Sequence, residues 1–321
     1  MLCVKPLSLA RIPSPIERLA RLSVEVGVEL WIKRDDLTGF GTSGNKVRKL
    51  EWLVADAVAR GADTLITCGG LQSNHARTTA VVARRLGLRP VLLLRHPASG
   101  APEGPPDGNL LLDVLLGAEV HWCSPAEYAA ERSDRMKAIA AALRRQGHTP
   151  YIIPEGGSNG LGARGFIAAA EELRAQDSGF DTVVVAVGSG GTLAGLVLGE
   201  AATHVRGFAV CDDAPTFEQK VAAIADELSL ALPSLGDAWS VTDAWRGAAY
   251  GAASPEVWQT IRHVARTEGL LLDPTYTGKA FHGMLSEARA GGLGRRVLFW
   301  HTGGAFGLFG RGAEVGWPGS Q

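Results

Sequence analysis

The feature that most constrains the fold is a regular alternation of short β-branched runs with longer helical patterns. The strand-like runs are continuously apolar, as in Thr-Val-Val-Val-Ala-Val from Thr182 to Val187. Such strands are typical of parallel sheets covered by helices on both faces, so we predict an α/β protein built of βαβ units. The expected strands are residues 28–34, 63–67, 90–95, 118–122, 150–153, 182–187, 205–210 and 296–300, and the expected helices are residues 45–60, 74–86, 108–116, 125–146, 162–176, 192–202, 255–268 and 278–290.

Length and charge narrow the class of protein. A chain of 321 residues suits about two domains. The net charge of -1 gives no reason to expect a nucleic-acid partner. The uncharged stretch from Thr182 to Gly199 has the length of a membrane span, but the Gly-Ser-Gly-Gly-Thr run at its centre would break a spanning helix. We therefore predict a strand, a glycine turn and a helix there, and a cytoplasmic protein with no membrane partner and no signal peptide.

The cysteines are scattered along the chain and form no Cys-x-x-Cys pair. This spacing predicts neither a disulfide framework nor a metal site. Each thiol is expected to be a small buried apolar side chain. The four positions are Cys3, Cys68, Cys123 and Cys211.

Glycine is in excess, at 41 of 321 residues, or about 13% against a usual ~7%. Three glycine-rich turns follow predicted strands, at residues 39–46, 68–77 and 187–192. Ligands of parallel sheets bind at the carboxyl ends of the strands, and helix N-termini attract phosphate. Leu193 stands where a dinucleotide-binding fingerprint has its last glycine, and there is no P-loop motif. Residues 187–192 are therefore either a phosphate-binding turn or an ordinary tight βα turn.

Lys46 is the most suggestive single residue, because it follows Ser43-Gly44-Asn45 at a predicted helix start. The positive end of a helix dipole favours a neutral amine, which Schiff-base chemistry requires. An ordinary surface lysine is the alternative. Arg48 and Lys49, nearby, are expected on a solvated helix face.

The combination of motifs is far more specific than any one of them. The chain resembles the pyridoxal-phosphate (PLP) enzymes related to the tryptophan synthase β chain, and within them the branch of D-cysteine desulfhydrase and 1-aminocyclopropane-1-carboxylate (ACC) deaminase. The matches run in family order from one end of the chain to the other. They are IKRDDLTGFGTSGNK, SGNKVRKLEWL, GGLQSNHART, VGSGGTLAGL, GAAYGAASPE, LLLDPTYTGKA and HTGGAFGLF.

The resemblance implies a fold of two α/β domains, each an open, twisted, mostly parallel sheet covered by helices. PLP is expected in the cleft between them. The small domain would be residues 51–154, and the large, discontinuous domain residues 1–50 plus 155–321. The resemblance also implies a homodimer.

The resemblance also implies site residues. Lys46 would carry PLP as a Schiff base, and Asn74 would bind its 3'-hydroxyl. Thr277 and Thr302 would place neutral hydroxyls by the cofactor, with Thr302 near the pyridine nitrogen. The phosphate would be held by Gly188, Ser189, Gly190, Gly191 and Thr192. The substrate would meet Ser73, Asn74, His75, Tyr250 and Tyr276, with Lys46, Ser73 and the two tyrosines catalytic.

The activity implied is an α,β-elimination of D-cysteine, or of a related β-substituted amino acid, to pyruvate, ammonia and sulfide. ACC-deaminase-like members carry Glu and Leu where this chain has Thr277 and Thr302. Neutral hydroxyls make PLP a weaker electron sink, which suffices when the substrate carries a good leaving group. ACC deaminase and cysteate sulfo-lyase remain alternatives. A non-catalytic PLP-binding protein and a nucleotide-binding module without PLP are more remote.

Overall fold

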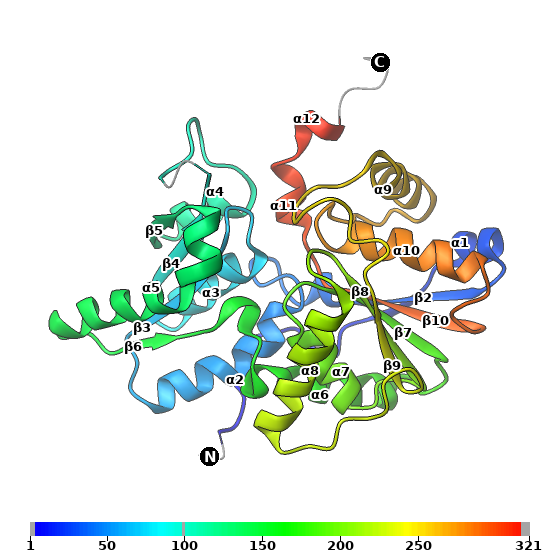
Figure 1. Cartoon of the computed structure of the whole chain (residues 1–321), viewed down its shortest axis with the longest axis horizontal. Helices are drawn as coiled ribbons and strands as arrows, with labels where there is room; N and C mark the ends of the chain where they lie inside the picture. The colour runs from blue at the N-terminus through cyan, green and yellow to red at the C-terminus, as the bar shows by residue number, and fades with distance from the viewer. Residues whose placement is uncertain (1–3, 98–99, 316–321) are drawn as a thin grey trace.

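The computed structural model describes residues 4–97 and 100–315, and its strands form two separate sheets (Figure 1). The six-stranded sheet has the order β1 (Ile16–Arg18), β2 (Glu29–Arg34), β10 (Arg296–His301), β7 (Thr182–Val187), β8 (His204–Ala209), β9 (Trp239–Thr242). The four-stranded sheet has the order β5 (Glu119–Cys123), β4 (Arg89–Arg95), β3 (Thr64–Gly70), β6 (Pro150–Ile152).

The pairing within these sheets confirms the predicted fold class. β1 runs antiparallel to β2, and every other pair is parallel. All of the predicted strands form. The edge strands β1 and β9, of three and four residues, were not predicted.

Both faces of the six-stranded sheet are covered, as the continuous apolar strands predict. Successive side chains of a strand point to opposite faces. In β10, Phe299 belongs to the apolar core on one face, and Leu298 and Trp300 to the core on the other. In β7, Val184 and Val185 divide in the same way. The sheet is therefore the central layer of a three-layer arrangement.

The predicted helices also form, mostly within two residues of their expected ends. The main exception is α7, which ends at Leu198 instead of residue 202. The helices are α1 (Ala20–Val26), α2 (Lys46–Ala59), α3 (Asn74–Arg85), α4 (Gly108–Leu115), α5 (Pro125–Arg145), α6 (Gly160–Gln176), α7 (Gly191–Leu198), α8 (Ala214–Leu228), α9 (Pro255–Glu268), α10 (Thr277–Arg289), α11 (Ala305–Phe309) and α12 (Gly312–Val315). Of these, α1, α8, α11 and α12 are not among the expected helices.

The strands of the small sheet all lie within residues 51–154, and those of the large sheet all lie outside that range. The expected boundary between residues 50 and 51 falls inside α2, which packs against α6. This helix therefore joins the two parts of the chain as one continuous rod. The limits of the two domains stay a prediction.

The expectation of a solvated face for Arg48 is wrong, because that side of α2 is covered and Arg48 is 2% exposed. Its guanidinium donates to Asp35 at 2.8 Å and to Glu172 at 2.9 Å. Asp35 also accepts from the indole of Trp300 at 2.8 Å. A buried charge of this kind is tolerated because its partners and hydrogen bonds are complete.

Two further sequence expectations concern membranes and thiols. Across residues 4–97 and 100–315, no helix is both long enough and apolar enough to cross a membrane.

Cys68 and Cys123 are buried free thiols, and Cys211 is partly buried and also free. Cys3 lies outside the described residues.

Candidate functional site

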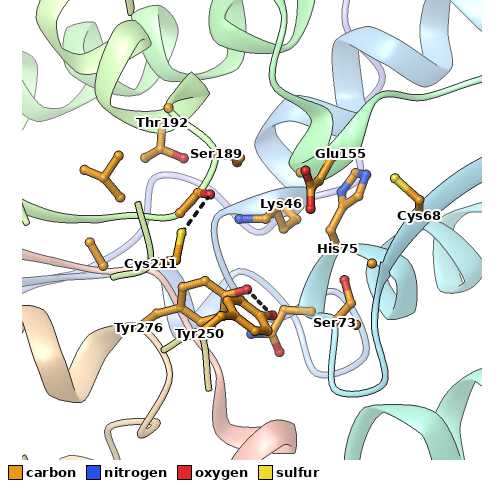
Figure 2. A pocket seen from close by; sticks show the side chains of 18 of the residues that line it. Lys46, Cys68, Ser73, His75, Glu155, Ser189, Thr192, Cys211, Tyr250 and Tyr276 are labelled. Atoms are coloured by element: carbon orange, nitrogen blue, oxygen red, sulfur yellow. Dashed lines mark hydrogen bonds between the residues drawn. The ribbon is translucent and has the colours of Figure 1, made fainter. Parts of the chain in front are cut away.

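A cavity of about 350 Å³ lies where the carboxyl ends of β3 and β4 face the carboxyl end of β7. Lys46 and the turns after β3 and β7 form much of its wall (Figure 2). The two sheets therefore contribute opposite walls of one site. This is the place at which open parallel sheets bind their ligands.

Lys46 is the first residue of α2, as predicted, and its side chain enters the cavity. Its Nζ donates to Asn45 Oδ1 at 3.0 Å. Burial lowers the pKa of Lys46 to about 8; Asp273 opposes the shift and the charge of Arg77 adds to it. Burial, rather than the helix dipole, is thus the main reason for a lowered pKa. An amine of this kind can act as a nucleophile near neutral pH.

The turn between β7 and α7 supplies backbone at the opposite side of Lys46 (Figure 2). Gly190 has a φ of 87°, a left-handed conformation that favours glycine. Gly188, Ser189, Gly190 and Thr192 line the cavity. Gly191 is set back from it, and its N–H donates to Ser158 Oγ at 3.2 Å. The turn leads directly into a helix N-terminus, which suits an anion.

Lys49 lies behind this turn, and the expectation that it is solvated is wrong. It is fully buried, and its Nζ donates to Gly156 O and to Ser158 Oγ, each at 3.1 Å. The same Ser158 hydroxyl lies 2.8 Å from Ser189 Oγ. Burial and the nearby Lys46 lower the pKa of Lys49. A spacing of three residues from Lys46 places both lysines on one helix face, which is the sequence signal that could have found it.

The start of α3 contributes three of the expected residues, and all of them line the cavity. Ser73 caps the helix, with its Oγ accepting from Ala76 N at 3.1 Å. Asn74 Oδ1 accepts from Asn109 Nδ2 at 3.1 Å. The third residue, His75, follows directly on the same turn of helix. A capped helix N-terminus can receive a carboxylate.

His75 lies against Thr67 and the end of β6. Its Nε2 is 2.9 Å from the hydroxyl of Thr67, which donates to Ile153 O at 3.0 Å. Within the described part of the chain, Nδ1 has no partner. Burial, with the charges of Lys46 and Lys49, holds the pKa of His75 well below its usual value. The ring is therefore neutral.

Tyr250 and Tyr276 come from separate loops and meet at the cavity wall. Their hydroxyl oxygens are 2.7 Å apart, and their rings meet edge to face (Figure 2). Burial raises the pKa of both phenols. Both are therefore neutral, and one hydroxyl donates to the other. Such a pair can pass a proton to a group bound in the cavity.

The two threonines expected at the cofactor have different positions. Thr302 lines the cavity, and its carbonyl oxygen accepts from Asn45 N at 3.1 Å. Thr277 is buried at the start of α10, and its Oγ1 donates to Asp273 Oδ1 at 2.7 Å. The structure brings Thr302 to the site, whereas Thr277 is not among the lining residues in the described part of the chain.

Glycines give the cavity its room. A Cβ on Gly188 would lie 2.9 Å from the ring of Tyr276. Gly44, with a φ of 108°, would bring a Cβ to 2.6 Å from Thr302 O. A buried amine, an anion-binding turn with the amine of Lys49 behind it, and close backbone approaches together fit a phosphorylated aromatic aldehyde. Pyridoxal phosphate is such a group.

Comparison with known proteins decides the family. Residues 7–303 match the family model described as pyridoxal-phosphate dependent enzyme. The chain belongs to this family. It is a PLP-dependent enzyme, as the resemblance implied.

Relatives in the family share most of this chain. A protein of Arabidopsis thaliana, named bifunctional D-cysteine desulfhydrase/1-aminocyclopropane-1-carboxylate deaminase, mitochondrial, is 44% identical over 94% of this chain and 79% of its own length. A D-cysteine desulfhydrase of Klebsiella pneumoniae is 42% identical over 94% of this chain and 95% of its own. The crystal structure of an ACC deaminase homologue superposes with a TM-score of 0.87 at 38% identity, covering 98% of this chain and 96% of the other.

The structure adds cavity residues that the family motifs do not contain. These include Glu155, Arg95 and Arg132. Glu155 follows β6, Arg95 ends β4, and Arg132 lies in α5. In these elements no local pattern distinguishes a cavity residue from a surface charge.

Proposed function

We propose that this PLP-dependent enzyme is a lyase that converts D-cysteine, or a related β-substituted amino acid, to pyruvate, ammonia and sulfide. The observation that carries the proposal is the placing of the lowered-pKa amine of Lys46 and the Tyr250–Tyr276 pair in one cavity. One group can remove a proton, and the pair can return one. The names of the Klebsiella and Arabidopsis relatives support the choice of D-cysteine.

When bound, PLP supplies an electron sink for the bonds at the substrate's α-carbon. We propose that Lys46 anchors it and that Asn74 orients its ring. Ser189 and the backbone of the following glycines would hold the phosphate, with the buried amine of Lys49 behind them. Thr302 would present a neutral hydroxyl to the ring.

The chain's own residues would move two protons. Lys46, once free, takes the α-proton, acting as a base held against the substrate. Tyr250 or Tyr276 donates a proton as the Cβ–S bond breaks, and the shared hydroxyl contact replaces that proton from the partner phenol. The electron pair of the C–H bond forms the new double bond, and the pair of the C–S bond leaves with sulfur. Released 2-aminoacrylate then reacts with water, giving pyruvate and ammonium.

The start of α3 is the proposed site of the substrate carboxylate. Ser73 already caps this helix, and the first N–H groups of α3 offer donors there. We assign Ser73 and Asn74 to this carboxylate. His75 is the third member, and among the described residues its Nδ1 has no partner, so it is free for a contact with the substrate.

ACC deamination is the second candidate, favoured by the bifunctional name of the Arabidopsis relative. ACC has no thiolate to expel, so its ring opening needs a stronger electron sink. Thr302 is neutral, and the hydroxyl of Thr277 is already engaged with Asp273. We therefore expect ACC to be the poorer substrate.

The test is product release by the PLP-loaded enzyme from D-cysteine, L-cysteine and ACC. We expect pyruvate and sulfide from D-cysteine, with far less 2-oxobutyrate from ACC. The Lys46→Arg variant should lack both the visible absorption of the bound cofactor and all turnover. Fast turnover of ACC with none of D-cysteine would reverse the ranking.

Other predictions concern the wider setting of the enzyme. We propose a small domain at residues 51–154 and a large domain from the rest of the chain. The homodimer and the cytoplasmic location stay predictions. Sedimentation of the purified holoenzyme would test the first of these, and localisation of the protein in cells the second.

A further inference from the structure

Asn109, the second residue of α4, is fully buried and contacts Asn74, which lines the cavity. The backbone N–H of Asn109 donates to Gln72 Oε1 at 2.8 Å. Its Nδ2 donates to Gln72 O and to Asn74 Oδ1, each at 3.1 Å. Its Oδ1 accepts from Arg77 Nε at 3.1 Å. Both amide hydrogens and the amide oxygen of Asn109 are therefore in use.

Two of these partners fix which way the amide of Asn109 points. A carbonyl oxygen such as Gln72 O can only accept a hydrogen bond, and the guanidinium of Arg77 can only donate. Turning the amide over would set its oxygen against the carbonyl of Gln72 and its NH2 group against the guanidinium. Both hydrogen bonds would be lost, so this amide has a single orientation.

Arg77 is itself held in place. It is fully buried, and its Nη1 donates to Gly41 O at 2.6 Å while Nη2 donates to Ser43 O at 3.0 Å. Both carbonyls belong to the glycine-rich turn that precedes α2. A buried network in which every group has its partner is rigid. The amide of Asn109 is therefore locked with its Nδ2 toward Asn74.

The orientation of Asn109 determines that of Asn74. A donor facing the amide of Asn74 selects its oxygen, which leaves the Nδ2 of Asn74 on the other branch of the amide. Among the residues that the structure describes, this Nδ2 has no acceptor. Because Asn74 lines the cavity, its NH2 group is available to an acceptor bound there.

We propose that Asn109 is a positioning residue for the cofactor: acting through Asn74, it keeps an amide donor, and not an amide oxygen, toward the 3'-oxygen of PLP. This inference rests on the proposed contact between Asn74 and the cofactor ring, and it does not depend on which amino acid is the substrate. A donor at this position favours the negatively charged form of the 3'-oxygen, whereas an amide oxygen would disfavour it.

This charge can be read from the colour of the holoenzyme. The bound cofactor absorbs visible light when the 3'-oxygen has lost its proton, and near-ultraviolet light when the oxygen keeps it. The ratio of the two absorptions therefore reports which end of the Asn74 amide faces the ring. A second readout is the dissociation constant of PLP, measured by equilibrium dialysis.

The experiment reverses the polarity of Asn109 and keeps its shape. In Asn109→Asp one carboxylate oxygen still accepts from Arg77, but the other replaces Nδ2 and faces Asn74 Oδ1. The amide of Asn74 should then turn over to donate to the new carboxylate, which places its oxygen toward the cofactor. Asn159→Asp is the matched control. There the Oδ1 that accepts from Gly162 N at 2.9 Å is retained, at the start of α6.

We expect the ratio of visible to near-ultraviolet absorption to fall about 10- to 100-fold in Asn109→Asp, the value of a hydrogen bond to a charged group. The dissociation constant of PLP should rise about 10-fold or more. Asn159→Asp should leave both quantities at the wild-type values. In an Asn74→Ala background, Asn109→Asp should cause no further change, because Asn109 acts only through the amide of Asn74.

Other outcomes overturn the inference in distinguishable ways. If Asn109→Asp has the absorption and the PLP affinity of the wild type, Asn109 does not orient Asn74. If Asn109→Asp changes both quantities by the same factor with and without the amide of Asn74, Asn109 only supports the fold. If Asn74→Ala leaves both quantities unchanged, it is the proposed contact between Asn74 and the ring that fails.

A second variant covers the case in which Asn109→Asp does not fold. Asn109→Ala removes the donor but allows Asn74 either orientation, so it should show a smaller effect than Asn74→Ala on both quantities. It should again show none in the Asn74→Ala background. An effect of Asn109→Ala that persists there would contradict the proposal.

Discussion

The lowered pKa of Lys46 makes a prediction about the cofactor-free enzyme. Only a neutral amine attacks an aldehyde, so the rate of PLP uptake should follow the neutral fraction of Lys46. Burial places the pKa of this amine at about 8 instead of 10.5. The experiment varies the pH. The Lys46→Arg variant, which cannot form a Schiff base with PLP, is the control.

The size of the effect follows from the two pKa values. With a pKa of about 8, the neutral fraction is about one tenth at pH 7 and about one half at pH 8. A lysine with its usual pKa would be only about 0.03% neutral at pH 7, roughly 300-fold less. Because the pKa of this cationic group is lowered, the rate of PLP uptake should rise with pH up to about 8 and then level off.

The assay is stopped-flow absorbance after mixing apoenzyme with PLP across this pH range. The same reaction with Nα-acetyl-lysine, with each rate first divided by the neutral fraction of that amine, gives the titration of PLP itself, and the enzyme rates are corrected by this reference. Asp273 raises the pKa of Lys46, so Asp273→Asn should move the plateau to lower pH while keeping Oδ1 as the acceptor for Thr277. A corrected rate that still rises tenfold per unit well above pH 8 would refute the reasoning.

Three further predictions test other parts of the structure. Tyr250→Phe and Tyr276→Phe should each lower kcat/KM for D-cysteine by about 100-fold or more, and the double variant should lose less than the product of the two, because the hydroxyls act as one pair. Lys279→Met leaves three backbone carbonyls, those of Val210, Arg246 and Ala249, without their donor. It should lower the free energy of unfolding in urea by about 2–4 kcal/mol, whereas Lys137→Met, at an exposed ion pair, should change it by less than about 0.5 kcal/mol. Gly195→Ala would place a Cβ 2.3 Å from Phe166 Cβ where α7 crosses α6, and a loss of about 1–3 kcal/mol is expected in the same assay. Gly312→Ala meets no atom within 4 Å, so equal losses in the two glycine variants would contradict a packing effect.

The fold could be predicted from the sequence because its signals are local. Apolar runs such as Thr182–Val187 report burial on both faces, and caps such as Ser124 and Asn159 mark the start of helices. The edge strands β1 and β9 and the helices α1, α8, α11 and α12 were not predicted. Most of what is local in the chain was therefore predictable, although α8, with 15 residues, was missed.

The site residues fall into two groups: those that a local motif predicts and those that depend on packing between distant parts of the chain. Lys46 and the turn at Ser189 follow from motifs, since each combines a residue type with a helix start. The prediction for Lys49 was wrong: its spacing of three residues from Lys46 puts both lysines on one helix face, but only the packing around α2 shows that this face is covered. Arg95 had no signal at all, and its stacking on Tyr250 joins residues far apart in the chain.

By itself the sequence determined the α/β class, the order of the strands along the chain, and the motifs that identify a PLP-dependent enzyme. These depend on residue spacing within single elements. Only the tertiary structure decided which charges are buried, which are paired, and which meet across the cavity. Burial lowers the pKa of Lys46, and among residues 4–97 and 100–315 no carboxylate pairs with Arg95. Both are properties of what surrounds a side chain, and those neighbours come from distant parts of the chain.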